Sequence, residues 1–106
     1  MAKSVGSGGV FVSDSKTVTS AGTSEALAAT NFLLWNALTI VAKDNNTGRV
    51  YVGGLISSTV ASTTNRGMGP GDTLILRPSR GHSIDLSAVY LDVSVSGEGV
   101  DYYATA

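Results

Sequence analysis

The chain has 106 residues, which is enough for one domain with a single core, because a chain of this size buries roughly 65% of the surface that its unfolded form exposes. Hydrophobic residues make up 42% of the chain and charged residues only 14%. This composition excludes a disordered tail and predicts a surface built from Ser, Thr, Gly and small apolar groups. The net charge of -1 provides no basic excess for phosphates, and the chain has no cysteine and one histidine. We therefore expect no nucleic-acid partner, no cofactor and no metal site.

The N-terminal segment differs in composition from the rest of the chain. Residues 1–9 are rich in Gly and Ser and show no periodicity, so we expect an extended N-terminal arm, followed by one domain over 10–106. Ordering such an arm costs roughly 1–2 kcal/mol per residue in backbone entropy. The arm is therefore expected to adopt a fixed structure through contacts with another chain. The longest apolar stretch, 32–42, is too short to span a bilayer, and the N-terminus lacks the apolar core of a signal peptide. We expect a protein made in the cytoplasm, with no membrane partner.

The first third of the domain is predicted to be mostly extended. Short strands are expected at 10–12 and 16–19, with a turn at 21–22. Residues 24–36 fit either a strand or a short helix, because their apolar positions partly follow helical spacing. In an otherwise β-rich chain we favour a strand, and a single helical turn at 30–35 stays open.

The middle of the chain contains the clearest hairpin pattern. Residues 38–44 alternate between two faces, the turn-forming residues 45–48 follow, and 49–53 form a second extended run. We therefore predict a hairpin from these three segments. Residues 57–67 are almost entirely polar and are expected to form a long loop or a poorly buried edge strand.

The last third is predicted to contain three further strands. A Gly- and Pro-rich turn introduces a strand at 72–77. The longest β run, 84–95, changes its apolar face near Ala88, which predicts a bulge or two strands joined at a bend. A second hairpin turn is expected at 96–99, before a closing strand at 100–104. Seven or eight short strands without a long helix predict an all-β fold, either an antiparallel β-sandwich or a jelly-roll-like small barrel.

Alternation also predicts which polar residues face the solvent. Four aspartates alternate with apolar neighbours and are expected on the surface, where they would discourage edge-to-edge pairing: Asp72, Asp85, Asp92 and Asp101. Tyr102 and Tyr103 are adjacent, so they must face opposite ways on a strand. Trp35 and the tyrosines could line a sugar-binding or base-stacking surface, but in a neutral domain we favour core or subunit-contact positions.

No catalytic constellation emerges from the sequence. His82 stands beside Ser83 and Asp85, the residue types of a hydrolase triad. On a strand, Ser83 and Asp85 would point to one side and His82 to the other, so the three are not expected to converge. Residues 44–48 lack the alternating acids and final Glu of a calcium loop, and no glycine-rich stretch opens a helix. We assign no catalytic residue and do not expect an enzyme.

Three segments resemble a pattern found in small virion proteins of tailed bacteriophages. They are Arg-Val-Tyr-Val-Gly-Gly at 49–54, Gly-Pro-Gly-Asp-Thr-Leu-Ile-Leu at 69–76, and Leu-Ser-Ala-Val-Tyr-Leu at 86–91. The resemblance covers less than half of the chain and leaves 1–35 outside. It implies a compact β-sandwich or jelly-roll-like domain on a capsid or tail, and decoration proteins of this kind form small oligomers that clamp neighbouring capsomers.

The resemblance, the neutral surface and the arm together predict a virion structural protein. The leading hypothesis is a capsid decoration (cement) protein on the capsid surface, which stabilises the phage head by bridging major capsid subunits. Its expected partners are the major capsid protein and copies of itself, as a dimer or trimer. Alternatives are a tail, fibre or adaptor subunit, and a carbohydrate- or receptor-binding β-sandwich with two exposed aromatic residues on one patch. The partner contact is expected at these residues: Lys3, Val5, Val10, Phe11 and Trp35.

Overall fold

The structure, a computed structural model, describes residues 11–54 and 67–105. The predicted arm at 1–9, and all but the last residue of the loop predicted at 57–67, lie outside the described residues. The described part of the chain forms nine strands and one short 3₁₀ helix: β1 (Phe11–Thr17), β2 (Glu25–Ala26), β3 (Leu33–Leu34), β4 (Ala37–Ala42), β5 (Val50–Gly53), β6 (Thr73–Leu76), β7 (Ile84–Asp85), η1 (Leu86–Ala88), β8 (Tyr90–Val93) and β9 (Gly99–Thr105).

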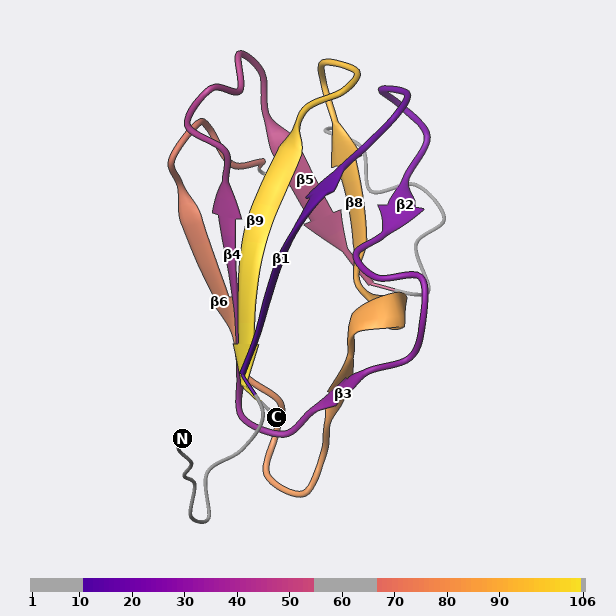
Figure 1. The fold of residues 1–106 in the computed structure, drawn as a ribbon, viewed down its shortest axis with the longest axis vertical. Helices are drawn as coiled ribbons and strands as arrows, with labels where there is room; N and C mark the ends of the chain where they lie inside the picture. Colours follow the sequence, from indigo (N-terminus) through magenta and orange to yellow (C-terminus); the bar gives the residue numbers. More distant parts are fainter. Residues whose placement is uncertain (1–10, 55–66, 106) are drawn as a thin grey trace, which may run out of the picture.

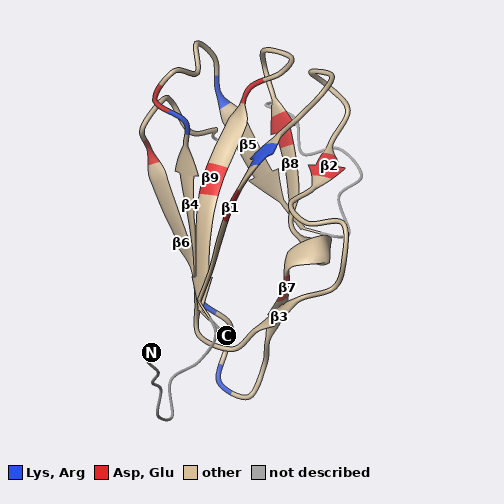
Figure 2. Cartoon of the chain, in the orientation of Figure 1, with Lys and Arg blue, Asp and Glu red and all other residues tan. Residues whose placement is uncertain are grey.

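The strands form two main layers, as Figure 1 shows. One layer is a four-stranded sheet in the order β1-β9-β4-β6, and the other is a three-stranded sheet in the order β2-β8-β5. The two-residue strands β3 and β7 make a small third sheet, and every strand pair is antiparallel. No charged residue occurs in β4 or β6, and the charged positions of the four-stranded sheet lie on β1 and β9 (Figure 2). The all-β, antiparallel, sandwich-like fold predicted from the sequence is confirmed.

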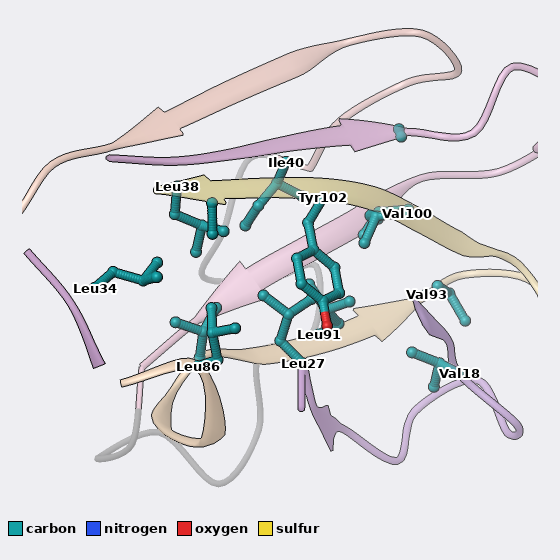
Figure 3. Close-up of a cluster of buried hydrophobic side chains, with 14 residues drawn as sticks. Val18, Leu27, Leu34, Leu38, Ile40, Leu86, Leu91, Val93, Val100 and Tyr102 are labelled. Carbon is teal, nitrogen blue, oxygen red and sulfur yellow. The ribbon is translucent and has the colours of Figure 1, made fainter. Parts of the chain in front are cut away.

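The core fills the space between the two main sheets. In β4, Leu38, Ile40 and Ala42 are fully buried, and the residues that alternate with them are only partly covered. Tyr102 of β9 and Leu91 of β8 meet these side chains from the two layers (Figure 3). Each large aliphatic side chain buried in this way stabilises the fold by about 1.5–3 kcal/mol. The period-2 pattern of the strands therefore decides which face of each sheet lies inward.

Both predicted hairpins are wrong. β4 and β5 lie in different sheets, so residues 45–48 carry the chain from one layer to the other. In the same way, 96–99 connects β8 of the three-stranded sheet to β9 of the four-stranded sheet. Gly- and Asn-rich turns serve both kinds of connection, because local turn chemistry reverses the chain without choosing the sheet that receives the next strand.

Side chains fix these two crossings against each other. Asn46 is buried; its side-chain amide donates to the backbone oxygen of Gly99 at 2.8 Å, and its side-chain oxygen accepts from the Gly99 N–H at 3.4 Å. The Glu98 carboxylate accepts hydrogen bonds from the Gly48 N–H at 2.9 Å and from the N–H and hydroxyl of Thr47, each at 2.7 Å. These bonds join positions that are far apart in the sequence. They connect the two loops, 45–48 and 96–99, at the same end of the sandwich.

The hydrogen bonds that the Glu98 carboxylate accepts from Thr47 and Gly48 predict an acid-sensitive contribution to stability. The Gly48 N–H, followed by the Thr47 hydroxyl, holds the pKa of Glu98 below its ordinary value of 4.5. Because the folded-state pKa is lowered, this contribution is present above pH 4.5 and is lost as the pH falls through the folded-state value. We expect Glu98→Gln to lower the free energy of unfolding at pH 7, and the difference from wild type to shrink below pH 4.5. Urea unfolding across this range measures both effects, and a difference that stays constant with pH would contradict the assignment.

The structure revises one local expectation, refines a second and confirms a third. Separate strands were predicted at 10–12 and 16–19, but residues 11–17 form one continuous strand, β1, which pairs along its whole length with β9. Segment 24–36 is extended rather than helical, as favoured, but it contains only the short strands β2 and β3 and no helical turn at 30–35. The break predicted near Ala88 is confirmed, because η1 separates β7 from β8.

The Asp85 side chain stabilises this break in the strand. Its Oδ1 accepts from the Ser87 N–H at 3.0 Å, from the Ser87 hydroxyl at 2.9 Å and from the Phe32 N–H at 3.2 Å. The bonds from Ser87, followed by the bond from Phe32, lower the pKa of Asp85. The carboxylate therefore caps η1 and connects it to the segment that precedes β3.

Asp92 departs from the prediction that it faces solvent. It is only 1% exposed, and its Oδ1 accepts from the Gly22 N–H at 2.9 Å and from its neighbour Val93 at 2.7 Å. Asp92 does point away from the core, opposite Tyr51 in the register of β5 and β8. Tyr51 is itself buried, and Gly67 lies against its ring. The alternation gave the correct face, but that face of the three-stranded sheet is covered here.

Candidate functional site

One side of the four-stranded sheet faces away from the core and carries several of the exposed hydrophobic residues of the described structure. The registers of β1, β9, β4 and β6 place Ser13, Tyr103, Thr39 and Ile75 in one row across all four strands. We call this side the outer face; it consists of Phe11, Ser13, Ser15, Ala37, Thr39, Val41, Thr73, Ile75, Asp101, Tyr103 and Thr105.

Three large hydrophobic side chains project from the outer face. Phe11 is 65% exposed, Ile75 50% and Tyr103 43%. The rings of Phe11 and Tyr103 stack, with centroids 6.5 Å apart and planes inclined by 22°. The first and last strands of the domain thus build one exposed aromatic pair. Exposed aromatic residues of this kind are common in protein–protein contacts.

Within the four strands, the outer face carries one charged side chain, Asp101, and that charge is paired. Asp101 accepts a hydrogen bond from the Lys43 ammonium at 2.7 Å. The two charged residues of β1, Asp14 and Lys16, alternate to the opposite side of that strand. Asp14 lies opposite the buried Tyr102 on the inner side of the sheet. Burial of Tyr102, and secondly the Asp14 charge, raises the pKa of Tyr102. The outer face is therefore a nearly neutral surface of Thr, Ser and apolar groups.

The predicted partner-contact residues fall into two groups. Phe11 is exposed on the outer face, and Trp35 is 59% exposed two residues before β4. Lys3, Val5 and Val10 lie outside the described residues. The predicted partner-contact set did not include Ile75, and it did not include Tyr103, which was considered only among the aromatic residues for a sugar-binding or subunit-contact surface. The signal for Tyr103 was present, since the expectation that Tyr102 and Tyr103 face opposite ways is confirmed by exposures of 4% and 43%.

A cavity of about 470 Å³ lies between β5 and β6. Its one charged side chain is Asp72, whose Oδ2 accepts a hydrogen bond from the Gly69 N–H at 2.8 Å and so closes the turn before β6. The described lining contains no second titratable group, so these residues present no acid–base pair. The lining residues are Val50, Val52, Gly67, Met68, Asp72, Thr73 and Leu74.

Other kinds of site have no support in the described part of the chain. Within residues 11–54 and 67–105, no group of three or more His, Cys, Asp or Glu side chains is arranged to hold a metal ion. No described helix is long and apolar enough to cross a membrane. Asp85, the acid next to His82 and Ser83 in the sequence, is engaged with η1 as described above.

Comparison of the chain with protein-family models, with curated proteins and with solved structures gives no match.

Proposed function

We propose that this domain is a structural protein of a phage particle, specifically a capsid decoration (cement) protein that binds the major capsid protein through its outer face. The observation that carries the proposal is the exposure of Phe11, Tyr103 and Ile75 on a sheet face whose four strands contribute one charge, that of Asp101, which is already paired. The capsid surface is the location that this proposal requires.

The energetics of such a face favour a broad protein contact. A neutral surface loses little hydration energy on burial, whereas unpaired charges would have to be desolvated. Stable protein interfaces bury about 1,200–2,000 Å² in total, and a few aromatic residues usually supply most of the binding energy. Repetition around a shell strengthens a modest contact at each site, because every bound copy adds resistance to the separation of neighbouring capsomers.

The resemblance to phage virion proteins supports the same class. Its three segments correspond to β5, to β6 with its preceding turn, and to η1 with the start of β8. These segments supply part of the core and one edge of the four-stranded sheet. The outer-face aromatics lie on β1 and β9, outside the resembling segments, so they carry the proposal independently.

A shell-binding assay tests the proposal. We expect the wild-type chain to co-sediment with empty shells assembled from the major capsid protein of the same phage. The double variant Phe11→Ser/Tyr103→Ser should lose at least about 100-fold in affinity, because two exposed aromatic anchors are removed. Val95→Ser is the matched control, since Val95 is 40% exposed but lies after β8, away from the outer face.

Each other outcome of that assay argues against part of the proposal. If the wild-type chain does not bind shells, or binds isolated tails instead, the decoration role is wrong. If the double variant binds like Val95→Ser, the outer face is not the contact. Deletion of residues 1–9 should leave a folded domain that no longer binds shells, and full saturation by the shortened chain would refute the role of the arm.

A carbohydrate-binding role is the second candidate, and the Phe11–Tyr103 pair is the observation that favours it. Two exposed aromatic rings on one patch are what a sugar-binding face needs. This role predicts glycan-array signals that disappear in Tyr103→Ser or Trp35→Ser. The absence of any signal from the wild-type chain would leave the decoration role as the better explanation of the same surface.

A further inference from the structure

The two sides of the sandwich are protected differently. On one side, Lys16 of β1 donates to Glu25 of β2 at 2.8 Å, so an ion pair links the edge strands of the two sheets. Glu25 also accepts from the Thr19 N–H at 2.8 Å, and the bonds from Lys16 and Thr19 lower its pKa. The edge strand β1 therefore carries charges, a common device against pairing with another chain.

The opposite edge, β6, has no such protection. Its sequence is Thr-Leu-Ile-Leu, without a charge, and among the described strands its one partner is β4. In Figure 1, β6 is the outermost strand of its sheet, and no described element lies beyond it. Ile75 stands half-exposed in this strand. An uncharged, apolar edge is the part of a sheet most ready to accept another strand.

The hydrogen-bond pattern shows which backbone groups of β6 point outward. The Ala42 N–H donates to the Asp72 oxygen at 2.9 Å, so Asp72 turns its oxygen toward β4. Backbone groups alternate in direction along an antiparallel strand, and those of Thr73, Ile75 and Arg77 therefore turn away from β4. None of these three N–H groups donates a backbone hydrogen bond to an acceptor among the described residues outside the sheet ladder.

We propose that β6 pairs antiparallel with β6 of a second copy of this chain, around a two-fold axis at Ile75. In this register Ile75 lies opposite Ile75 of the second copy and exchanges both backbone hydrogen bonds with it. Leu74 lies opposite Leu76 on the inner side, and Thr73 lies opposite Arg77 on the outer side. In each pair the two side chains lie on the same side of the sheet, and no pair brings like charges together. Pairing of two identical strands around a two-fold axis requires both properties.

The pairing joins the two four-stranded sheets into one and continues the row of Tyr103, Thr39 and Ile75 across the dimer. It stops at a dimer, because the far edge, β1, carries Asp14 and Lys16. The inference goes beyond the decoration role, since it concerns the purified chain alone and names the edge through which two copies associate.

Cysteine cross-linking tests the register, and the chain suits this method because it has no cysteine of its own. In a hydrogen-bonded antiparallel pair the Cα atoms are about 5.5 Å apart, within the range that a disulfide spans. We expect Ile75→Cys to form a disulfide-linked dimer on mild oxidation. Thr73→Cys is the matched control: it lies on the same edge and the same face, but it is displaced from its copy by four residues, roughly 14 Å along the strand at about 3.4 Å per residue.

Sedimentation equilibrium of the unlinked chain completes the test. Wild-type protein should show a monomer–dimer equilibrium, and Ile75→Lys should raise the dimer dissociation constant at least tenfold, because two like charges would meet on the axis. Val95→Lys should match wild type. The inference is overturned if wild type stays monomeric, if Ile75→Lys dimerises like wild type, or if the two cysteine variants cross-link equally. A monomer that still binds shells would refute the inference alone, and a dimer that does not bind shells would refute only the decoration role.

Discussion

Replacing Leu38 by Ala is expected to lower the free energy of unfolding by about 3 kcal/mol, a large fraction of the stability of a small domain. Leu38 is fully buried in β4, an inner strand of the four-stranded sheet, and lies beside Leu76 and Ala104 on the two neighbouring strands. Figure 3 shows its side chain directed into the core between the layers. The loss has two parts: the transfer energy of the deleted methyl groups, and the cavity that two rigid sheets cannot close.

Thr39→Ala is the matched control, because Thr39 is the next residue of β4 and points to the outer face. Its cost should stay below about 1 kcal/mol, since only strand propensity and cross-strand contacts change. Urea or guanidinium unfolding followed by circular dichroism measures both variants. Equal costs at the two positions would mean that the inner and outer faces of the four-stranded sheet are wrongly assigned.

The faces of the strands could be predicted from the sequence because alternation is a local property. Leu38 and Ile40 were expected on one side of their strand, and they are buried together. Tyr102 and Tyr103 were expected to diverge, and they do. The change of apolar face near Ala88 correctly predicted a break in the last long β run, where η1 separates β7 from β8. None of these predictions needs to know which strand lies alongside.

Strand partners could not be predicted, because the groups that select them are distant in the sequence. Asn46 binds Gly99, and Thr47 and Gly48 bind Glu98; these contacts turn an apparent hairpin loop into a crossing between sheets. Asp92 was assigned to the correct face, but Tyr51 and the loop residue Gly22 bury it there. Alternation identifies a face of the sheet and carries no information about the loops that later cover it.

The same limit applies to the candidate surface. Phe11 was expected at a partner contact from its place next to the arm, but its neighbour Tyr103 stands at the other end of the chain. Their stacking depends on the pairing of β1 with β9, the first and last strands of the domain. The neutral character of the outer face did follow from composition, since only 14% of the chain is charged. Composition thus predicted what the surface is made of, and topology decided which residues it brings together.

Replacing Gly99 by Ala is expected to cost about 3 kcal/mol, through a different mechanism from the core substitution. Gly99 begins β9 opposite Thr17 of β1, and a Cβ at this position would overlap the backbone of Lys16 and Thr17. Backbone atoms cannot move aside by changing rotamer, so β1 would have to shift away from β9. The Asn46 side chain, hydrogen-bonded to Gly99 on both its N–H and its oxygen, opposes the compensating movement of β9.

Gly97→Ala separates this steric effect from the ordinary cost of losing a glycine. Gly97 has a φ of 86°, which an alanine adopts at a cost of about 1 kcal/mol, but no atom lies within 4 Å of the Cβ it would gain. Gly99 has no positive φ and no space, so its substitution should be the more harmful although the two glycines stand two residues apart. Denaturant unfolding ranks the two variants, and hydrogen exchange should show reduced protection of the β1–β9 amides in Gly99→Ala alone. If Gly97→Ala proves the more destabilising, β1 and β9 do not approach each other closely at Gly99. The exposed pair of Phe11 and Tyr103, which depends on the same strand pairing, would then lose its support as well.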